Sequence, residues 1–188
     1  MKTNIIKSIR LTLVLIVVLC VIYPVLISFA GKLSKGNGGG ETITVNGKVV
    51  GYANEGQSFT QPKYFWGRPS AVAYNAAGSA GSNKGPSNPD YLKDVSSRID
   101  TLLKYHPYLK RSDIPAEMVT ASGSGLDPDI SPDAAKIQIK RVADNRGLTV
   151  QQVTELVSTH TEAPLLGLFG PAKVNVLKLN VALDGLKR

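Results

Sequence analysis

Serine and histidine are the side chains of this sequence that could carry nucleophilic chemistry. Ser122 and Ser124 lie in a short glycine-rich segment, and the chain has two histidines, His106 and His160. A serine hydrolase would need one imidazole within hydrogen-bonding reach of the hydroxyl. The segment lacks the G-x-S-x-G spacing of a nucleophile elbow and the Gly-Lys-Ser/Thr ending of a phosphate loop. We therefore expect a structural turn here and keep an exported hydrolase using Ser124 and His160 as a third hypothesis.

The acidic residues and the single thiol provide few further candidates for catalysis or metal binding. Asp127 and Asp129 are two residues apart in LDPDISP, a spacing that suits acid-base work or cation binding. The same Asp-Pro and Ser-Pro pairs also shape turns and cap helices, which is the interpretation we favour. Cys20 is the only cysteine, so a disulfide scaffold and a thiolate zinc site are excluded. The sequence predicts no catalytic residues and no metal site.

The element that positions everything else is an apolar stretch near the N-terminus. Residues 11–31 carry no charge, and Lys2, Lys7 and Arg10 precede them. About 20 apolar residues are needed to cross a bilayer as a helix. Because positive charges mark the cytoplasmic flank, we expect residues 1–10 to form a cytoplasmic tail and residues 32 onward to lie outside. The expected location is the cell (inner) membrane, as a single-pass protein.

A cleaved signal peptide is the alternative for the same stretch. Ser28-Phe29-Ala30 is a small-x-small triplet, and Pro24 could end a helix before it. The apolar run nevertheless exceeds the roughly 7 to 15 residues of a signal-peptide core. Cleavage would release a secreted binding protein with no role in ATP use, whereas retention gives an anchored one.

Composition separates a linker from a domain. Residues 32–40 (KLSKGNGGG) have the composition of a flexible linker, and residues 41–188 are long enough to form one domain with an ordinary core. Lys and Arg number 22 against 14 Asp and Glu, but no run of basic residues interleaved with aromatics is present. We therefore expect no nucleic-acid partner.

The domain begins with strand and loop signals. Two β-branched runs, residues 42–45 and 48–50, flank Asn46-Gly47, which predicts a hairpin with a two-residue turn. Residues 59–88 are rich in glycine and proline yet carry several aromatic side chains, which favours an ordered loop over disorder. We expect Trp66, Arg68 and Ser70 to organise this loop and to contribute to a docking surface.

Helix signals follow. Pro89 behind Asn88 and the spacing of Leu92, Val95, Ile99 and Leu102 predict a helix to about residue 109. A second helix is capped by Ser131 and stops at Gly147, and a third begins with a capping box of Thr149 and Gln152. Residues 174–181 alternate and predict a C-terminal strand. The expected fold class is α+β: one transmembrane helix, then an extracytoplasmic domain with a β-hairpin, a C-terminal strand and about three helices.

Several long motifs resemble one family, the C subunits of the Kdp potassium-transporting ATPase (KdpC). They occur in the right order along essentially the whole chain. They are YFWGRPSA (64–71), GSNKGPSNPD (81–90), PAEMVTASGSGLDPDISPDAA (115–135), RVADNRG (141–147), HTE (160–162) and VNVLKLNVALD (174–184). Departures such as Ala80, Lys84, Ala163-Pro164 and Lys178 fall in turns or at alternating positions.

The resemblance implies an accessory subunit of a high-affinity potassium importer that is not an enzyme by itself. Its partners would be a channel-like potassium-selective subunit, a P-type ATPase subunit and a small membrane subunit, together with membrane lipid. The family is described as a catalytic chaperone that raises the ATP affinity of the ATPase subunit. The partner interface that we assign comprises Trp66, Arg68, Ser70, Asn83 and Asn88.

Gln152 has two interpretations. Within LTVQQ (148–152) it resembles the key residue of a signature motif proposed for ATP contact, which would make it cofactor-binding. The predicted topology instead places it outside the membrane, away from a cytoplasmic nucleotide site, and the capping box explains it locally. We expect no firmly bound cofactor, with ATP used by the partner subunit.

Overall fold

The computed structural model describes residues 2–186 and contains two compact units, Met1–Thr42 and Ile43–Arg188. The first unit is a helix in three parts: α1 (Lys2–Ile16), a π-helical stretch η1 (Val17–Ile22) and α2 (Tyr23–Gly31). Pro24 accounts for the π-helical stretch, because proline removes one backbone donor and its ring clashes with the carbonyl four residues earlier. Just before it, the Tyr23 N–H donates to the carbonyl of Val18, five residues back.

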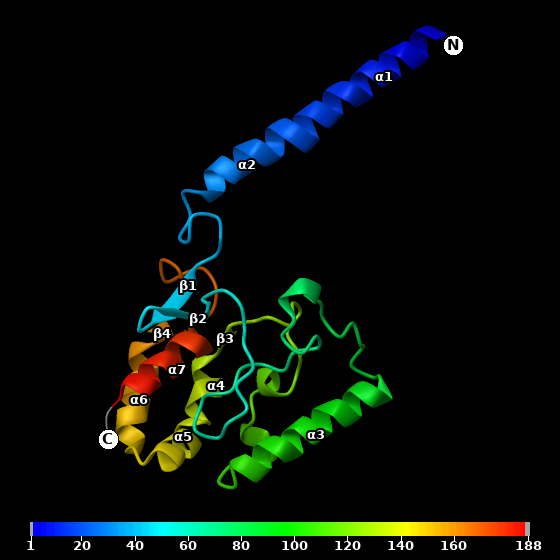
Figure 1. The fold of residues 1–188 in the computed structure, drawn as a ribbon. Helices are drawn as coiled ribbons and strands as arrows, with labels where there is room; N and C mark the ends of the chain where they lie inside the picture. The colour runs from blue at the N-terminus through cyan, green and yellow to red at the C-terminus, as the bar shows by residue number, and fades with distance from the viewer. Residues whose placement is uncertain (1, 187–188) are drawn as a thin grey trace. The chain divides into compact units, whose positions relative to one another are not determined.

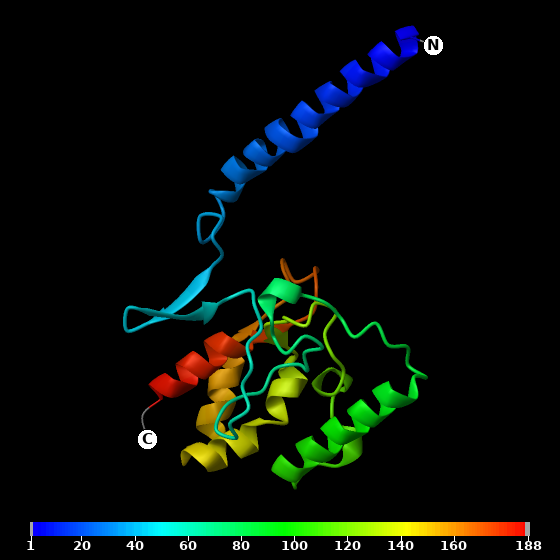
Figure 2. The same cartoon turned by 45° about the vertical axis from the view of Figure 1, so that its right-hand side comes forward.

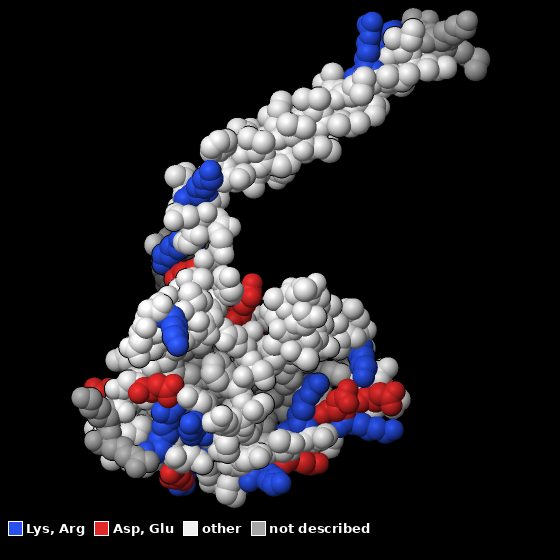
Figure 3. All heavy atoms as spheres, in the orientation of Figure 1, with Lys and Arg blue, Asp and Glu red and all other residues white. Residues whose placement is uncertain are grey.

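This helix is long and apolar enough to cross a membrane. Within the helix Asn4–Gly31, an 18-residue window has a mean hydropathy of 3.0, and no part of that window is buried within the structure. Figure 3 shows basic atoms near its two ends and an uncharged surface between them. The helix predicted for residues 11–31 is therefore confirmed, and the chain fits a single-pass membrane protein.

The second unit opens with the predicted hairpin. Strands β1 (Thr42–Val45) and β2 (Lys48–Tyr52) pair as a two-stranded sheet. The two turn residues, Asn46 and Gly47, have φ angles of 50° and 77°. Positive φ at both positions defines the turn whose twist matches that of the strands, which is why Asn-Gly predicts it.

A second sheet has three very short strands in the order β3–β5–β4, all antiparallel. They are β3 (Asp129–Ile130), β4 (Thr161–Glu162) and β5 (Lys173–Asn175). Val174 of β5 faces Ile130 on one side and Thr161 on the other. Lys173 forms ion pairs with Asp129 at 2.8 Å and with Glu162 at 3.8 Å, which ties both outer strands to the central one.

Four helices pack beside this sheet and enclose the core (Figures 1 and 2). They are α4 (Pro132–Lys136), α5 (Ile139–Arg146), α6 (Val150–Thr159) and α7 (Val176–Gly185). Ser131 caps α4 and Gly147 ends α5 in the left-handed conformation, as predicted, although a break at residues 137–138 divides the expected single helix in two. The buried hydrophobic side chains of these helices are Ala134, Ala135, Ile139, Val142, Ala143, Val153, Val157, Val176, Leu177, Leu179 and Leu183.

The C-terminal strand predicted over residues 174–181 is wrong beyond Asn175. The chain pairs as β5 for three residues and then turns into α7. Asn175 accepts a hydrogen bond from the Lys178 N–H at 3.0 Å and so caps the helix. Val176, Asn180 and Leu183 then lie one turn apart on the buried face, a helical spacing that competes with the apparent alternation.

The remaining long helix, α3 (Pro89–Tyr105), lies on the other side of the domain from α6 and α7 (Figures 1 and 2). Asn88 caps it and Pro89 starts it, as predicted, but it ends four residues earlier than expected, before His106. The loop of residues 59–88 contains one short 3-10 turn, η2 (Ala76–Gly78), and two more, η3 (Arg111–Asp113) and η4 (Ala116–Met118), follow α3.

Candidate interaction site

Residues 62–68, the clamped segment, begin in a turn, in which the Tyr64 N–H donates to the Gln61 carbonyl at 3.1 Å, and continue without regular secondary structure or a neighbouring strand. Phe65 is completely buried. Asn180 of α7 accepts from the Phe65 N–H at 2.8 Å and donates to its carbonyl at 3.0 Å. Gln138 accepts from the Trp66 N–H at 2.8 Å and donates to its carbonyl at 3.1 Å. Two side-chain amides thus supply the backbone partners that a sheet would otherwise provide.

Arg141 of α5 holds the same segment from inside. Its exposed fraction is 3%, and its guanidinium donates to the carbonyls of Pro62 and Tyr64, to Gln138 and to the ring of His106. The guanidinium carbon also lies 4.1 Å from the centre of the Trp66 ring. Burial lowers the pKa of Arg141 to about 10, so it keeps its charge at neutral pH.

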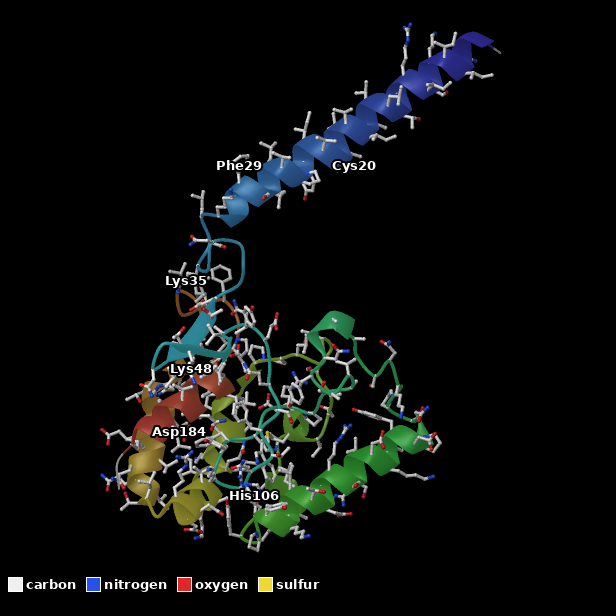
Figure 4. All side chains as sticks on the ribbon, in the orientation of Figure 1. Cys20, Phe29, Lys35, Lys48, His106 and Asp184 are labelled. Carbon is white, nitrogen blue, oxygen red and sulfur yellow. The ribbon has the colours of Figure 1, made fainter. Side chains whose placement is uncertain are left out.

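His106 completes this buried cluster. Its Nδ1 lies 2.8 Å from the carbonyl of Leu102 and its Nε2 lies 2.9 Å from Nε of Arg141. Because a guanidinium can only donate and a carbonyl can only accept, the ring is neutral with its proton on Nδ1. Burial lowers the pKa of His106 from 6.5 to about 4, with the Arg141 charge acting in the same direction. Figure 4 places this side chain at the end of α3.

A second clamp lies next to the first, at the domain surface. Arg146 donates to the carbonyl of Lys63 at 2.9 Å and pairs with Asp184 at 2.6 Å. The hydroxyl of Tyr64 donates to the same carboxylate at 3.0 Å, and Arg146 lies 4.7 Å from the Tyr64 ring centre. Burial raises the pKa of Tyr64, and its hydrogen bond to Asp184 adds to that rise.

On its outer side the clamped segment forms one wall of a groove, with α3 as the opposite wall. The groove has a volume of about 420 Å³ and an apolar lining. Trp66 meets Tyr105 edge to face at 5.1 Å, and Arg98 of α3 donates to the carbonyl of Val119 at 2.8 Å. The lining residues are Ser58, Phe59, Thr60, Trp66, Gly67, Arg68, Pro69, Tyr74, Ser97, Arg98, Thr101, Leu102, Tyr105 and Met118.

Arg68 links this groove to the loop behind it. Its Nη1 pairs with Asp127 at 2.9 Å, while its Nε is buried without a hydrogen-bond partner. The hydroxyl of Tyr74 donates to the Arg68 carbonyl at 2.5 Å. Burial raises the pKa of Tyr74, and the charge of Asp127 adds to that rise. The Asp127 carboxylate also accepts from the Asp129 N–H, which agrees with a turn-forming role for this pair.

The five residues assigned to the interface lie in two places. Trp66 and Arg68 line the groove. The Ser70 hydroxyl accepts from the N–H groups of Val72 and Tyr74 and so shapes the loop that follows. Asn83 is exposed with a φ of 52°, and Asn88 caps α3. Asn88 therefore lies at the beginning of α3, Asn83 precedes that helix by six residues, and neither lines the groove.

Gln152 forms the predicted capping box at the start of α6. Its Oε1 accepts from the Thr149 N–H at 2.8 Å, and the Gln152 N–H donates to the Thr149 hydroxyl at 3.1 Å. Leu148 and Val153 pack against the core on either side of the box. The side-chain oxygen of Gln152 is thus already engaged within its own helix.

Ser124 and His160 form hydrogen bonds with residues other than each other. The Ser124 hydroxyl accepts from the Leu126 N–H at 3.0 Å, and Nδ1 of His160 lies 2.9 Å from the carbonyl of Leu156. Over residues 2–186 there is no group of three or more His, Cys, Asp or Glu side chains that could hold a metal ion.

Sequence reasoning missed the side chains that hold the site: His106, Gln138, Arg141, Arg146 and Asn180. The available signal was periodicity, since Gln138 and Arg141 fall at helical spacing with Ala135 and Val142 on the buried face. Polar residues at core-facing positions require buried partners, but the sequence does not show which backbone they meet.

This chain is similar to known proteins of one family over nearly its full length. Residues 5–185 match the family model described as KdpC: K+-transporting ATPase, c chain. A potassium-transporting ATPase KdpC subunit of Bacteroides fragilis is 58% identical over 190 residues, covering 100% of this chain and 99% of the relative. The subunit of the same name in Flavobacterium johnsoniae is 59% identical over 184 residues, covering 98% and 99%. That of Caldanaerobacter subterraneus subsp. tengcongensis is 48% identical over 178 residues, covering 94% and 92%.

Proposed function

This chain belongs to the KdpC family and is a subunit of a potassium-transporting ATPase, and from that premise we propose that it is a non-catalytic subunit whose outer domain docks on its partners through the groove. The partners we propose are a channel-like potassium-selective subunit, a P-type ATPase subunit and a small membrane subunit. The hydrolysis of ATP belongs to the P-type subunit, and this chain contributes assembly and support.

The observation that carries this proposal is the rigid presentation of the groove. The side chains of Gln138, Arg141 and Asn180 hold the backbone of the clamped segment on its inner side, so its outer side is preorganised. The groove combines Trp66, Tyr105 and Arg98, the residue types that dominate binding energy at protein interfaces. Its apolar lining and open shape suit an inserted side chain or loop of a partner.

The orientation that we propose puts the domain outside the cell. Lys7 and Arg10 precede the apolar part of the helix, so the N-terminus is the cytoplasmic end. In that orientation Gln152 lies on the far side of the membrane from a cytoplasmic nucleotide site. Its role is then the capping of α6, without contact to ATP.

Filling the groove tests the docking role. Thr101 is exposed and lines the groove, whereas its neighbour Asp100 is exposed but outside it. We expect Thr101→Trp to weaken co-purification of the other subunits by on the order of 2 kcal/mol, about thirtyfold in affinity, because a bulky ring occupies the docking space. Asp100→Trp, the matched control on the same helix, should leave assembly unchanged.

Two measurements make the result decisive. Circular dichroism of each purified variant should show the wild-type melting behaviour, since both substitutions are at exposed positions. Potassium-stimulated ATP hydrolysis should fall with Thr101→Trp in proportion to the loss of assembled complex. Full assembly of the Thr101→Trp variant would contradict docking at the groove. Arg68 is unsuitable for this test, because its pair with Asp127 also supports the fold.

A further inference from the structure

Residues 164–170, the apolar loop, connect β4 to β5 and expose four large hydrophobic side chains. The exposed fractions are 70% for Leu165, 81% for Leu166, 81% for Leu168 and 62% for Phe169. Such a concentration on one loop is unusual at a water-facing surface, because soluble proteins rarely expose contiguous apolar groups without a binding role. Neither the groove nor the clamped segment includes any of these residues.

The loop pairs part of its own backbone. Leu165 and Phe169 exchange two N–H to carbonyl hydrogen bonds, at 2.9 and 3.0 Å, and the Gly167 N–H donates to the Pro164 carbonyl at 2.8 Å. Closing the turn requires positive φ at Leu166 (56°) and Gly167 (71°). A leucine in the left-handed region is strained, yet here it projects from the tip of the loop. The loop is therefore a closed hairpin whose stem pairs its backbone, while the unpaired backbone groups at its tip can be hydrated at a headgroup boundary.

The absence of charge in the apolar loop and the short linker to the N-terminal helix indicate that this boundary is the membrane surface. Residues 163–172 carry no charge, and Glu162 and Lys173 bound them. Within the domain the apolar loop projects from the same end as the beginning of β1, where the chain arrives from the membrane helix (Figures 1 and 2). Only ten residues join α2 to β1, so this end of the domain cannot move more than about 35 Å from the end of the helix.

We propose that the apolar loop is a second membrane contact, which inserts Leu166 and Leu168 into the headgroup and acyl boundary of the bilayer that holds the N-terminal helix. A bilayer surface accepts a convex apolar tip without any complementary pocket, and the tether keeps it always within reach. A protein partner would need a concave apolar site of matching shape. With helix and loop both in the lipid, the domain has two points of attachment and a restricted orientation.

Site-specific fluorescence measures this contact in the full chain. In a Cys20→Ser background, Leu166→Cys and, separately, Leu168→Cys carry an environment-sensitive fluorophore, and the chain is reconstituted into phosphatidylcholine–phosphatidylglycerol vesicles. Lys104→Cys, at an exposed position near the end of α3, is the matched control. Nitroxide-labelled lipid quenches a probe in the bilayer boundary, whereas iodide quenches a probe in water.

We expect both loop probes to emit at shorter wavelength than the Lys104 probe, with severalfold stronger quenching by the lipid nitroxide and weaker quenching by iodide. Agreement between the two loop positions guards against a local effect of either substitution. Iodide quenching equal to that at Lys104 in the chain alone and in the assembled complex would overturn the proposal. Protection that appears only on assembly, without lipid quenching, would also overturn it and assign the loop to a protein partner. Neither result depends on docking at the groove.

Discussion

Arg141 is a buried cation whose partners are all neutral. Its guanidinium satisfies two backbone carbonyls of the clamped segment, the amide of Gln138 and the ring of His106. Removing it leaves several buried acceptors without donors, each at a cost of about 1 to 3 kcal/mol. The role of this arginine is therefore to fix the backbone that carries Trp66 and Arg68.

Arg141→Met is the corresponding prediction. We expect the free energy of unfolding to fall by roughly 3 kcal/mol, measured by chemical denaturation of the full chain in detergent. Lys140→Met, one residue away but on the exposed face, should change it by less than about 0.5 kcal/mol. Equal effects of the two substitutions would contradict a structural role for the buried guanidinium.

His106 makes the stability of the domain depend on pH. The unfolded chain takes up a proton as the pH falls through 6.5, whereas the folded ring resists protonation until about pH 4. The free energy of unfolding should therefore fall as the pH is lowered from 6.5 to 4. The side chain in His106→Gln keeps a donor and an acceptor but does not titrate. The free energy of unfolding of the variant should therefore depend less on pH between 6.5 and 4. A wild-type slope in the variant between those pH values would show that other groups cause it.

At the scale of elements, the start of α6 tests the two interpretations of Gln152. If capping is its role, Gln152→Glu should be tolerated, and Gln152→Ala should lower the free energy of unfolding by about 0.5 to 1 kcal/mol. The Michaelis constant of the assembled pump for ATP should stay unchanged with either variant. A severalfold rise in that constant with Gln152→Ala, in fully assembled complex, would instead support contact with ATP.

Local signals predicted those elements whose ends the sequence itself determines. Asn46-Gly47 specified the hairpin turn, Asn88-Pro89 the start of α3, and Gly147 the end of α5. The strand predicted for the segment after Val174 was wrong beyond Asn175, because alternation over a few apolar residues fits a strand and a buried helix equally well. Its outcome depends on capping by Asn175 and on packing against the core, and the second of these is tertiary.

The site was less predictable than the elements. Aromatic content identified the loop around Trp66 as ordered, but the reason for that order lies far away in the sequence. Asn180 and Gln138 meet the backbone of Phe65 and Trp66 across 115 and 72 residues. Such pairings depend on how helices pack, which no local pattern encodes, so the groove between the clamped segment and α3 emerges only from the three-dimensional structure.

At the scale of the whole molecule, the chain consists of an apolar helix long enough to cross a membrane and a domain that carries the candidate site. The helix and the domain form separate compact units, and the site described here lies entirely in the second. Substitutions in the groove can therefore be compared at constant membrane insertion. The side of the membrane on which the domain lies then decides which surfaces of the partner subunits it can reach.

The last prediction concerns that side. Lys7 and Arg10 flank the N-terminal end of the apolar stretch, which favours a cytoplasmic N-terminus. In a Cys20→Ser background, a membrane-impermeant thiol reagent applied to intact cells should label Lys104→Cys and not Asn4→Cys. Both positions are exposed, so permeabilised cells should label both, which controls for reactivity. Labelling of Asn4→Cys alone in intact cells would show that the N-terminus lies outside and would contradict this topology. A mature chain beginning at Gly31 would show that the helix is cleaved as a signal peptide.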